Sequence, residues 1–351
     1  MLAGLKRYFG GVFLGGLIVC SGCSPTGTPV LSSSKTPLVW PAPPEQARIR
    51  YVGMIDTEED VKEGKRRFPS LSQVLFGKKD LGVLLAPSAV ATDSAGRLFV
   101  ADRMGGVVHV FNFKTNDYYQ FGALRDDQTL QSPVGVMLVS DVVFVVDSQL
   151  RQVCVFDTQG TFHYAFGGEQ LKRPAGIAYL PSTQEVCIVD TADHNLKVFH
   201  RSGRYQRTLG GRGVQAGHFN FPTHLWVDQS ERLFVSDTLN YRVQVLDRHG
   251  VALRSFGQHG DRPGFFGHPC GVATDSLGHI YVIDRQFENV QVFDQNGRVL
   301  MAFGQEGKNE GEFWLPSGLC IDGRNWIYVA DTYNKRIQIF KLVEGEEGNS
   351  G

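Results

Sequence analysis

The stretch FVSDTLNYRVQVLDRHG, Phe234 to Gly250, places Asp237, Asn240 and Arg242 within six residues between two apolar runs. Such a group of polar side chains is typical of an active site. It is equally typical of a turn, because Asp and Asn side chains hydrogen-bond to nearby backbone groups. A catalytic constellation needs one well-placed set of residues, so the number of copies in the chain distinguishes the two interpretations.

The stretch recurs along the chain, and each copy carries an aspartate. These aspartates are Asp102, Asp147, Asp190, Asp237, Asp284 and Asp331, spaced by 45, 43, 47, 47 and 47 residues. Upstream of each lies a proline that opens a short apolar run, namely Pro87, Pro133, Pro174, Pro222, Pro269 and Pro316. A period of this size indicates a repeat architecture.

Each repeat predicts four short strands. In the repeat at 269–303 the strands are PCGVATD, IYVID, VQVFD and RVLMAFG, rich in Val, Ile, Phe and Tyr and separated by turn residues. Four-stranded units of about 45 residues, repeated, are typical of propeller blades around a channel. The sequence therefore predicts an all-β fold, a six-bladed β-propeller with four-stranded antiparallel blades.

The repeated aspartates are interpreted as structural turn residues. We expect Asp102, Asp147, Asp190, Asp237, Asp284 and Asp331 to accept backbone N–H bonds where the second strand of each blade ends. The Asp, Asn and Arg set is complete only around Asp237 and Asp331. The turn after Asp190 is expected to be two residues longer than the others.

The pattern P-x-G-V-A-x-D followed by L-Y-V-x-D-T-x-N-x-R-V-Q-V-F-D-x-x-G resembles the NHL repeat. Residues 221–247 and 315–340 carry it most fully, and the resemblance covers residues 87–341. It implies the six-bladed NHL propeller.

The N-terminal residues are similar to the export signal of bacterial lipoproteins. Lys6 and Arg7 precede an apolar run, and the small residues Ser21 and Gly22 precede Cys23. Cys20 stands where such signals usually carry Leu. The sequence predicts a signal peptide at 1–22, lipid attachment at Cys23 and a flexible tether over 23–46 that is rich in Ser, Thr and Pro. Because Ser24 follows the cysteine, the resemblance implies the outer membrane of the cell envelope.

The sixth repeat lacks an obvious fourth strand, and the run ARIRYVGMI at 47–55 can supply it. We expect this closing strand to pair beside 336–342; an independent strand on a small subdomain is the alternative. Residues 56–86 are expected to be a charged insertion with a short helix, because Ser70 and Gln73 form a capping box. A membrane-surface helix is the alternative. The propeller spans 87–342 and a disordered tail follows at 343–351.

Charge and cysteine content limit the function. The formal net charge is −1, and without residues 1–22, which hold two basic and no acidic side chains, it is −3. This balance argues against a nucleic-acid partner, including the RNA bound by a basic propeller face. No C-x-x-C-H motif occurs, and no cofactor is expected. The sequence leaves open whether the four cysteines, Cys154, Cys187, Cys270 and Cys320, are buried thiols or include one disulfide.

One face of the propeller is the candidate binding surface. The turns after the second strands and the connections between blades open on the same face, and they carry exposed aromatic and Arg side chains suited to an interface. The candidate partner-binding residues are Arg103, His224, Tyr241, Arg285 and Tyr333. For the aromatic residues of the G-x-F-x-x-P connections, the favoured prediction is that Phe221, Phe266 and Trp314 fill the seams between blades.

These features predict a non-catalytic envelope lipoprotein that acts as a scaffold for a protein or ligand, with no catalytic residue and no metal site. The resemblance to NHL lipoproteins found beside multihaem cytochromes implies an envelope protein partner in an electron-transfer or assembly complex. The alternative is a metal-dependent lyase or lactone hydrolase with its site in the channel. Related amidating lyases carry histidines soon after the blade-opening proline. Only His224 has that placement here, with His268 just before Pro269, so a three-histidine set is not visible.

Overall fold

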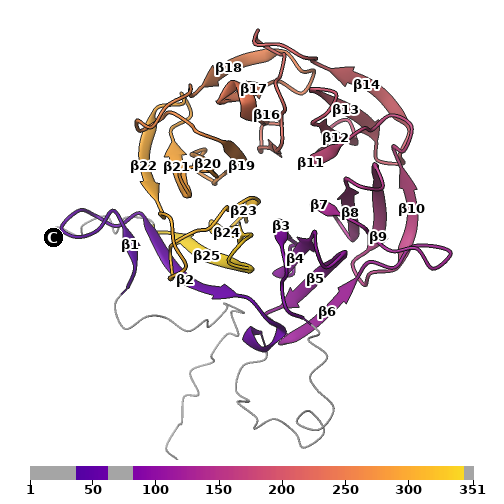
Figure 1. Cartoon of the computed structure of the whole chain (residues 1–351), viewed down its shortest axis with the longest axis horizontal. Helices are drawn as coiled ribbons and strands as arrows, with labels where there is room; N and C mark the ends of the chain where they lie inside the picture. The colour runs from indigo at the N-terminus through magenta and orange to yellow at the C-terminus, as the bar shows by residue number, and fades with distance from the viewer. Residues whose placement is uncertain (1–36, 62–81, 344–351) are drawn as a thin grey trace, which may run out of the picture.

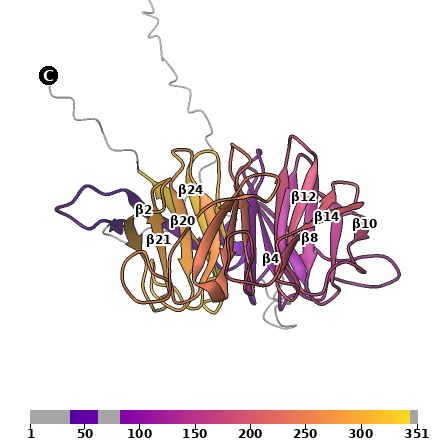
Figure 2. The ribbon, with the colours of Figure 1, turned by 90° about the horizontal axis from the view of Figure 1, so that it is seen from above.

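The computed structural model describes residues 37–61 and 82–343, and these residues form a ring of six β-sheets (Figure 1). Seen from its edge, the ring is a disc with the strands running through its thickness (Figure 2). The predicted all-β, six-bladed propeller is therefore confirmed. The expected signal peptide, lipid attachment at Cys23, the helix near Ser70 and nearly all of the tail lie outside the described residues.

Blades one to three each consist of four consecutive antiparallel strands. Blade one contains β3 (Pro87–Thr92), β4 (Arg97–Asp102), β5 (Val107–Asn112) and β6 (Asp117–Phe121). Blade two contains β7 (Pro133–Val139), β8 (Val142–Asp147), β9 (Gln152–Asp157) and β10 (Phe162–Phe166). Blade three contains β11 (Pro174–Leu180), β12 (Glu185–Asp190), β13 (Asn195–His200) and β14 (Tyr205–Leu209).

Blades four and five follow the same order, and blade six takes strands from both ends of the chain. Blade four contains β15 (Leu225–Val227), β16 (Leu233–Asp237), β17 (Arg242–Leu246) and β18 (Ala252–Phe256). Blade five contains β19 (Pro269–Thr274), β20 (Ile280–Asp284), β21 (Asn289–Phe293) and β22 (Val299–Phe303). Blade six contains β23 (Leu319–Ile321), β24 (Trp326–Asp331), β25 (Arg336–Leu342), β2 (Ile49–Ile55) and β1 (Val39–Trp40). Two single-turn 3₁₀ helices, η1 (Glu58–Asp60) and η2 (Thr238–Asn240), complete the described elements.

The predicted closing strand forms. β2 pairs antiparallel with β25, from Ile49 opposite Leu342 to Ile55 opposite Ile337, with a bulge between Tyr51 and Gly53. Figure 1 shows this N-terminal strand beside the C-terminal one, so the ring is closed by hydrogen bonds between the two ends of the propeller. Closure leaves β25 with no open edge to pair with another chain.

The last part of the expected tether is ordered as a fifth strand. β1 pairs with β2, and the N–H of Tyr51 donates to the carbonyl of Leu38. Trp40 packs against Phe303 and Phe340, each at a ring-centroid distance of 5.8 Å. Because an apolar ring of this size gains from burial, the chain lies against the propeller from residue 38 onward, earlier than the 23–46 boundary predicted.

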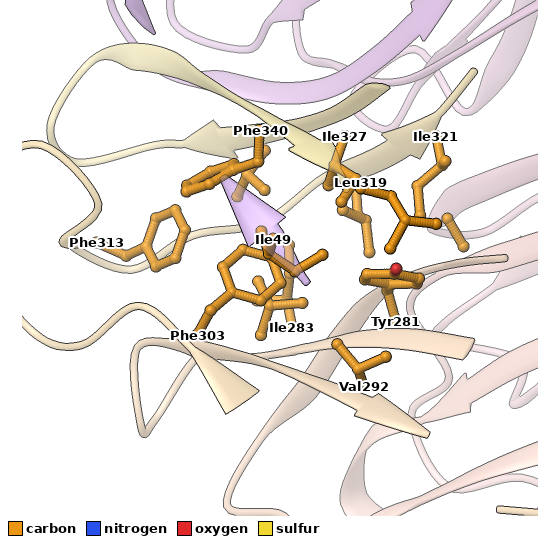
Figure 3. Packing of buried hydrophobic residues seen from close by; sticks show 14 of the residues in the cluster. Ile49, Tyr281, Ile283, Val292, Phe303, Phe313, Leu319, Ile321, Ile327 and Phe340 are labelled. Atoms are coloured by element: carbon orange, nitrogen blue, oxygen red, sulfur yellow. The ribbon is translucent and has the colours of Figure 1, made fainter. Parts of the chain in front are cut away.

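The core lies in the seams between neighbouring blades. Figure 3 shows the seam of blades five and six, where Phe303 and Tyr281 of blade five face Phe340 and Leu319 of blade six. Each of the other seams holds a similar apolar cluster. The strands are therefore apolar on consecutive positions because both faces of each blade are covered by neighbours.

One position fills every seam. It lies three residues before the blade-opening proline and is at most 2 % exposed in all six blades. Leucine occupies it in blades one to three and phenylalanine in blades four to six: Leu84, Leu130, Leu171, Phe219, Phe266 and Phe313. The prediction for the seam was correct at Phe266. It was wrong at Phe221, which is partly buried, and at Trp314, which is exposed. In these two connections Phe219 and Phe313 are the buried residues instead.

The four propeller cysteines are free thiols, all buried, which answers the question that the sequence left open: Cys154, Cys187, Cys270 and Cys320. Burial raises the pKa of each thiol to about 12, so they are protonated at neutral pH. Within residues 37–61 and 82–343, no helix is long and apolar enough to cross a membrane.

Candidate functional site

The six aspartate turns have one common geometry. Each aspartate is fully buried and pairs with the residue five positions later, as Asp190 does with Asn195 and Asp237 with Arg242. The expected longer turn after Asp190 is therefore wrong. The residue before the third strand adopts a positive φ in every blade, from 51° at Glu288 to 62° at Gly106, which closes the turn in the same number of residues.

The aspartates hold backbone, as predicted for turn residues. Asp147 accepts the N–H groups of Gln131 and Ser132, which precede the blade, and those of Gln149 and Leu150 in its own turn. Asp102 is bonded in the same way, and His109 also approaches it. Although burial opposes ionisation of Asp102, the nearby His109 ring and the backbone hydrogen bonds lower its pKa.

Blades four and six carry a fuller network. Asp331 accepts hydrogen bonds from the N–H of Trp314, Asn334 Nδ2, Arg336 Nε and Gln338 Nε2, at 2.8–2.9 Å. Arg336 also donates to the carbonyls of residues 308, 309 and 312. The carboxylate, guanidinium and amide groups of this corner are bonded to one another and to the backbone of the connection, so the network stabilises the connection between blades.

The turns and the interblade connections lie together on one face, which we call the Asp-turn face. The N–H of the turn donates to the connection in each blade, as Arg103 does to Ala86 and Tyr333 to Trp314. Of the predicted partner residues, Arg103 and Tyr333 are exposed on this face, whereas Tyr241 and Arg285 are partly buried there. His224 lies deeper, in the wall of the central channel.

Aromatic side chains on the Asp-turn face are packed against cations or histidines. Trp314 lies 5.6 Å from Tyr333 between ring centroids, and Lys308 Nζ lies 4.6 Å above the Trp314 ring. The Phe221 and His194 ring centroids are 4.4 Å apart, and Cζ of the Arg173 guanidinium lies 5.7 Å from the Phe221 ring centroid. Lys308, Arg173 and His194 were not identified from the sequence. Lys308 lies in the same connection as Trp314 with no motif to mark it, and Arg173 and His194 reach Phe221 from other segments.

One patch of this face exposes large apolar side chains across the seam of blades six and one. Its members are Leu85, Met104, Trp314 and Tyr333, which we call the six–one patch, with exposed fractions of 42, 72, 37 and 51 %. Thr332 Oγ1 donates to the carbonyl of Pro87 at 2.8 Å, which joins the turn of blade six to the start of β3 in blade one. Leu85 and Met104 were not identified from the sequence, since a single exposed Leu or Met has no distinctive motif.

The channel contains histidines but no converging set of metal ligands. Within the described part of the chain, no group of three or more His, Cys, Asp or Glu side chains is placed to hold a metal ion. His224 and His268 interact electrostatically, and Arg285 lies with them. A zinc site of the channel-lyase type needs three protein ligands, so the alternative of a metal-dependent lyase or lactone hydrolase has no such set among these residues.

A family model for the NHL repeat matches residues 313–340, which include β24 and most of β25. The protein is a six-bladed β-propeller with an NHL repeat. A search of curated proteins finds no match.

Solved structures share the fold at low sequence identity. Virginiamycin B lyase from Staphylococcus aureus has a TM-score of 0.53 and 11 % identity, covering 74 % of this chain and 96 % of that one. Kuenenia stuttgartiensis hydrazine synthase has a TM-score of 0.55 and 12 % identity, and the alignment covers 76 % of this chain and 99 % of that one. A chain of a nidogen/laminin complex has a TM-score of 0.53 and 19 % identity, and the alignment covers 71 % of this chain and 87 % of that one. These similarities support the propeller fold alone, because one fold hosts many functions.

Proposed function

We propose that this NHL propeller is a non-catalytic lipoprotein of the cell envelope that binds a partner protein through the six–one patch. The observation that carries the proposal is the exposure of Leu85, Met104, Trp314 and Tyr333 on one face of the ring, on the two sides of a seam that the Thr332–Pro87 hydrogen bond joins. Surface patches of this kind mark interaction sites, and Trp and Tyr are common anchors of protein interfaces.

The surroundings of the patch suit a protein interface. Lys308 lies above Trp314, and Lys335, two residues after Tyr333, is exposed in the same turn, so charged groups accompany the aromatic side chains. The turns that carry them are held by buried aspartates, so binding would order few groups on this side. The nidogen/laminin complex supports the proposal by analogy, since it contains a chain of this fold within a protein complex.

The anchoring part of the proposal rests on the signal-like N-terminus and on Cys23. Lipid attachment at Cys23, followed by the segment up to Leu38, would tether the disc to a membrane, in our proposal the outer membrane. The resemblance to lipoproteins found beside multihaem cytochromes makes an electron-transfer or assembly complex the partner that we propose to test first.

A photo-crosslinking residue at Tyr333 or Met104, introduced in cells that make the protein, tests the partner surface. Both positions should give an adduct of the same mass, and Trp314→Ala should reduce its yield. The matched control is Tyr205, which is similarly exposed but lies on the outer strand β14. Equal adducts from Tyr205, or none from Tyr333 and Met104, would contradict the proposal.

Membrane fractionation of the Cys23→Ser variant tests the anchor separately. We expect loss of fatty-acid labelling and release of the folded propeller from the membrane fraction. Continued membrane association of the unlabelled variant would show that the anchor is not a lipid on Cys23.

A further inference from the structure

The central channel contains a cavity of about 440 Å³, which is large enough for a small molecule. First strands of the blades form most of its wall, and the wall is mainly apolar. The larger side chains in the wall are Met137, Leu138, Tyr179, His224, Trp226 and Ile321. An apolar cavity with few polar groups is the usual form of a ligand site.

An unpaired cation lies near the Asp-turn end of this channel. The Arg285 guanidinium makes no hydrogen bond and no ion pair with any residue in the described ranges, and its Nε is buried without a partner. The neighbouring Asp284 cannot serve as its partner, because that carboxylate already accepts four backbone N–H groups. A half-buried cation without a counter-charge is costly, so the position suits an anion that comes from outside.

A chain of hydrogen bonds connects Arg285 to the cavity wall. The N–H of Arg285 donates to the carbonyl of His268, and the next residue, Pro269, accepts from Thr238 Oγ1 at 2.9 Å. Thr238 Oγ1 lies 2.8 Å from Thr223 Oγ1, which lies 3.0 Å from His224 Nδ1. His224 lines the cavity, and its Nε2 has no hydrogen-bond partner within the described residues. These bonds fix the backbone of Arg285 relative to the cavity wall, and the Arg285 charge acts on His224 and on Cys270 beside the wall, although Arg285 itself does not line the cavity.

We infer that the channel binds a small monocarboxylate with an apolar body. The carboxylate is held by the terminal nitrogens of Arg285, which remain reachable by solvent, together with His224 Nε2. The apolar body lies in the cavity against Trp226 and its neighbours. The inference does not rest on the proposed partner surface, which lies over blades six and one.

The charges around the site favour a single negative charge. The pKa of His224 is lowered to about 3 by burial, by the Arg285 charge and by His268, so its imidazole is neutral at physiological pH. The pKa of His268 is also lowered, by burial and by Arg285. One guanidinium accompanied by two neutral rings matches a carboxylate better than a phosphate dianion, which would need further cations.

Sodium octanoate is a suitable probe, because it combines one carboxylate with an apolar chain. Isothermal titration of the full chain should show octanoate binding. Octanamide of equal length should bind at least about tenfold more weakly, because it carries no charge. Arg285→Gln should reduce octanoate affinity by a similar factor and leave octanamide unchanged. The matched control is Arg103→Gln, at the equivalent turn position of blade one, which should change octanoate affinity by less than about twofold.

Three outcomes would overturn the inference. They are equal binding of octanoate and octanamide to the wild type, unchanged octanoate affinity of Arg285→Gln, and no octanoate binding up to about 10 mM. Inorganic phosphate that binds as tightly as octanoate, with the same dependence on Arg285, would also exclude an apolar carboxylate as the ligand class. The acid–amide comparison uses the wild-type protein alone, so it decides the question even if Arg285→Gln fails to fold.

Discussion

Blades one to three and blades four to six fill the same seam position with different side chains. Leucine lies three residues before the opening proline in the first half of the ring, and phenylalanine in the second half. The larger phenylalanine side chain is accompanied by an additional backbone bridge in blades four to six. The connection before each of blades four to six forms a short parallel bridge that ends at the phenylalanine, as Glu306 does with Phe313.

A buried glutamine holds these longer connections. Gln291 accepts the N–H of Gly264 and donates to the carbonyl of Phe265, both at 2.8 Å. Gln244 and Gln338 do the same in blades four and six. The matching positions of blades one to three are His109, Cys154 and Lys197.

A glycine completes this arrangement at the end of the fourth strand. At Gly257, where φ is 91°, an added Cβ would lie 2.4 Å from the Phe266 ring. The comparison teaches that a blade seam needs one buried apolar group at a fixed place. A larger group is accommodated where the backbone around it is held by an amide side chain. The glycine is common to both halves, because an added Cβ at Gly167 would likewise lie 2.5 Å from Leu171.

The largest expected effect is at the seam phenylalanine. Phe266→Ala should lower the free energy of unfolding by about 3–5 kcal/mol, because it leaves a cavity in a fully buried position. Phe266→Leu, which copies the first half of the ring, should cost clearly less. Chemical denaturation measures both, and Phe265→Ala is the control at the partly buried neighbour. Equal losses for Leu and Ala would show that the two halves are not equivalent at this position.

The next effect concerns the corner network of blade six. Arg336→Ala should cost about 3 kcal/mol, since it removes the charged partner of a buried carboxylate and leaves three carbonyls without their donor. Gln152→Ala changes the matching position of blade two, where backbone groups satisfy Asp147, and should cost less than about 0.5 kcal/mol. Similar losses in both variants would argue that the fuller network adds no stability.

A smaller effect is expected at the bridging glutamine. Gln291→Ala leaves the N–H of Gly264 and the carbonyl of Phe265 without partners and should cost about 2 kcal/mol. Lys197→Ala is the matched change in blade three, and it should cost less than Gln291→Ala, because Asp193 keeps its ion pair with Lys172 and no backbone group loses its partner. Hydrogen exchange of the 258–266 connection should increase in the glutamine variant alone.

The smallest effect is a dependence on pH. The folded-state pKa of His224, about 3, is below its ordinary value of 6.5, so its contribution to stability is complete above pH 6.5 and is lost as the pH falls toward 3. His224→Gln should therefore lose less stability than the wild type between pH 7 and pH 5, by on the order of 1 kcal/mol. Denaturation midpoints at the two pH values measure this, and parallel losses would show that His224 does not titrate on unfolding.

Much of the site could be described from the sequence in outline but not in detail. The recurrence of the aspartates predicts that they hold turns, and Asp147 with its four backbone donors confirms it. Which aromatic of a connection is buried was predicted wrongly at Phe221 and Trp314. A usable signal was present, because Phe219, Phe266 and Phe313 share a constant offset from the proline and a spacing of 47.

By itself, the sequence determined the number of blades, the strand order within each blade and the closure of the ring by 47–55. These follow from hydrogen-bonding patterns and apolar alternation, which are local properties repeated along the chain. The tertiary structure alone decided that Leu85, Met104, Trp314 and Tyr333 are exposed on the same face beside one seam, and that Arg285 lies unpaired near His224. Such contacts join different blades, and their distances depend on how the whole ring closes.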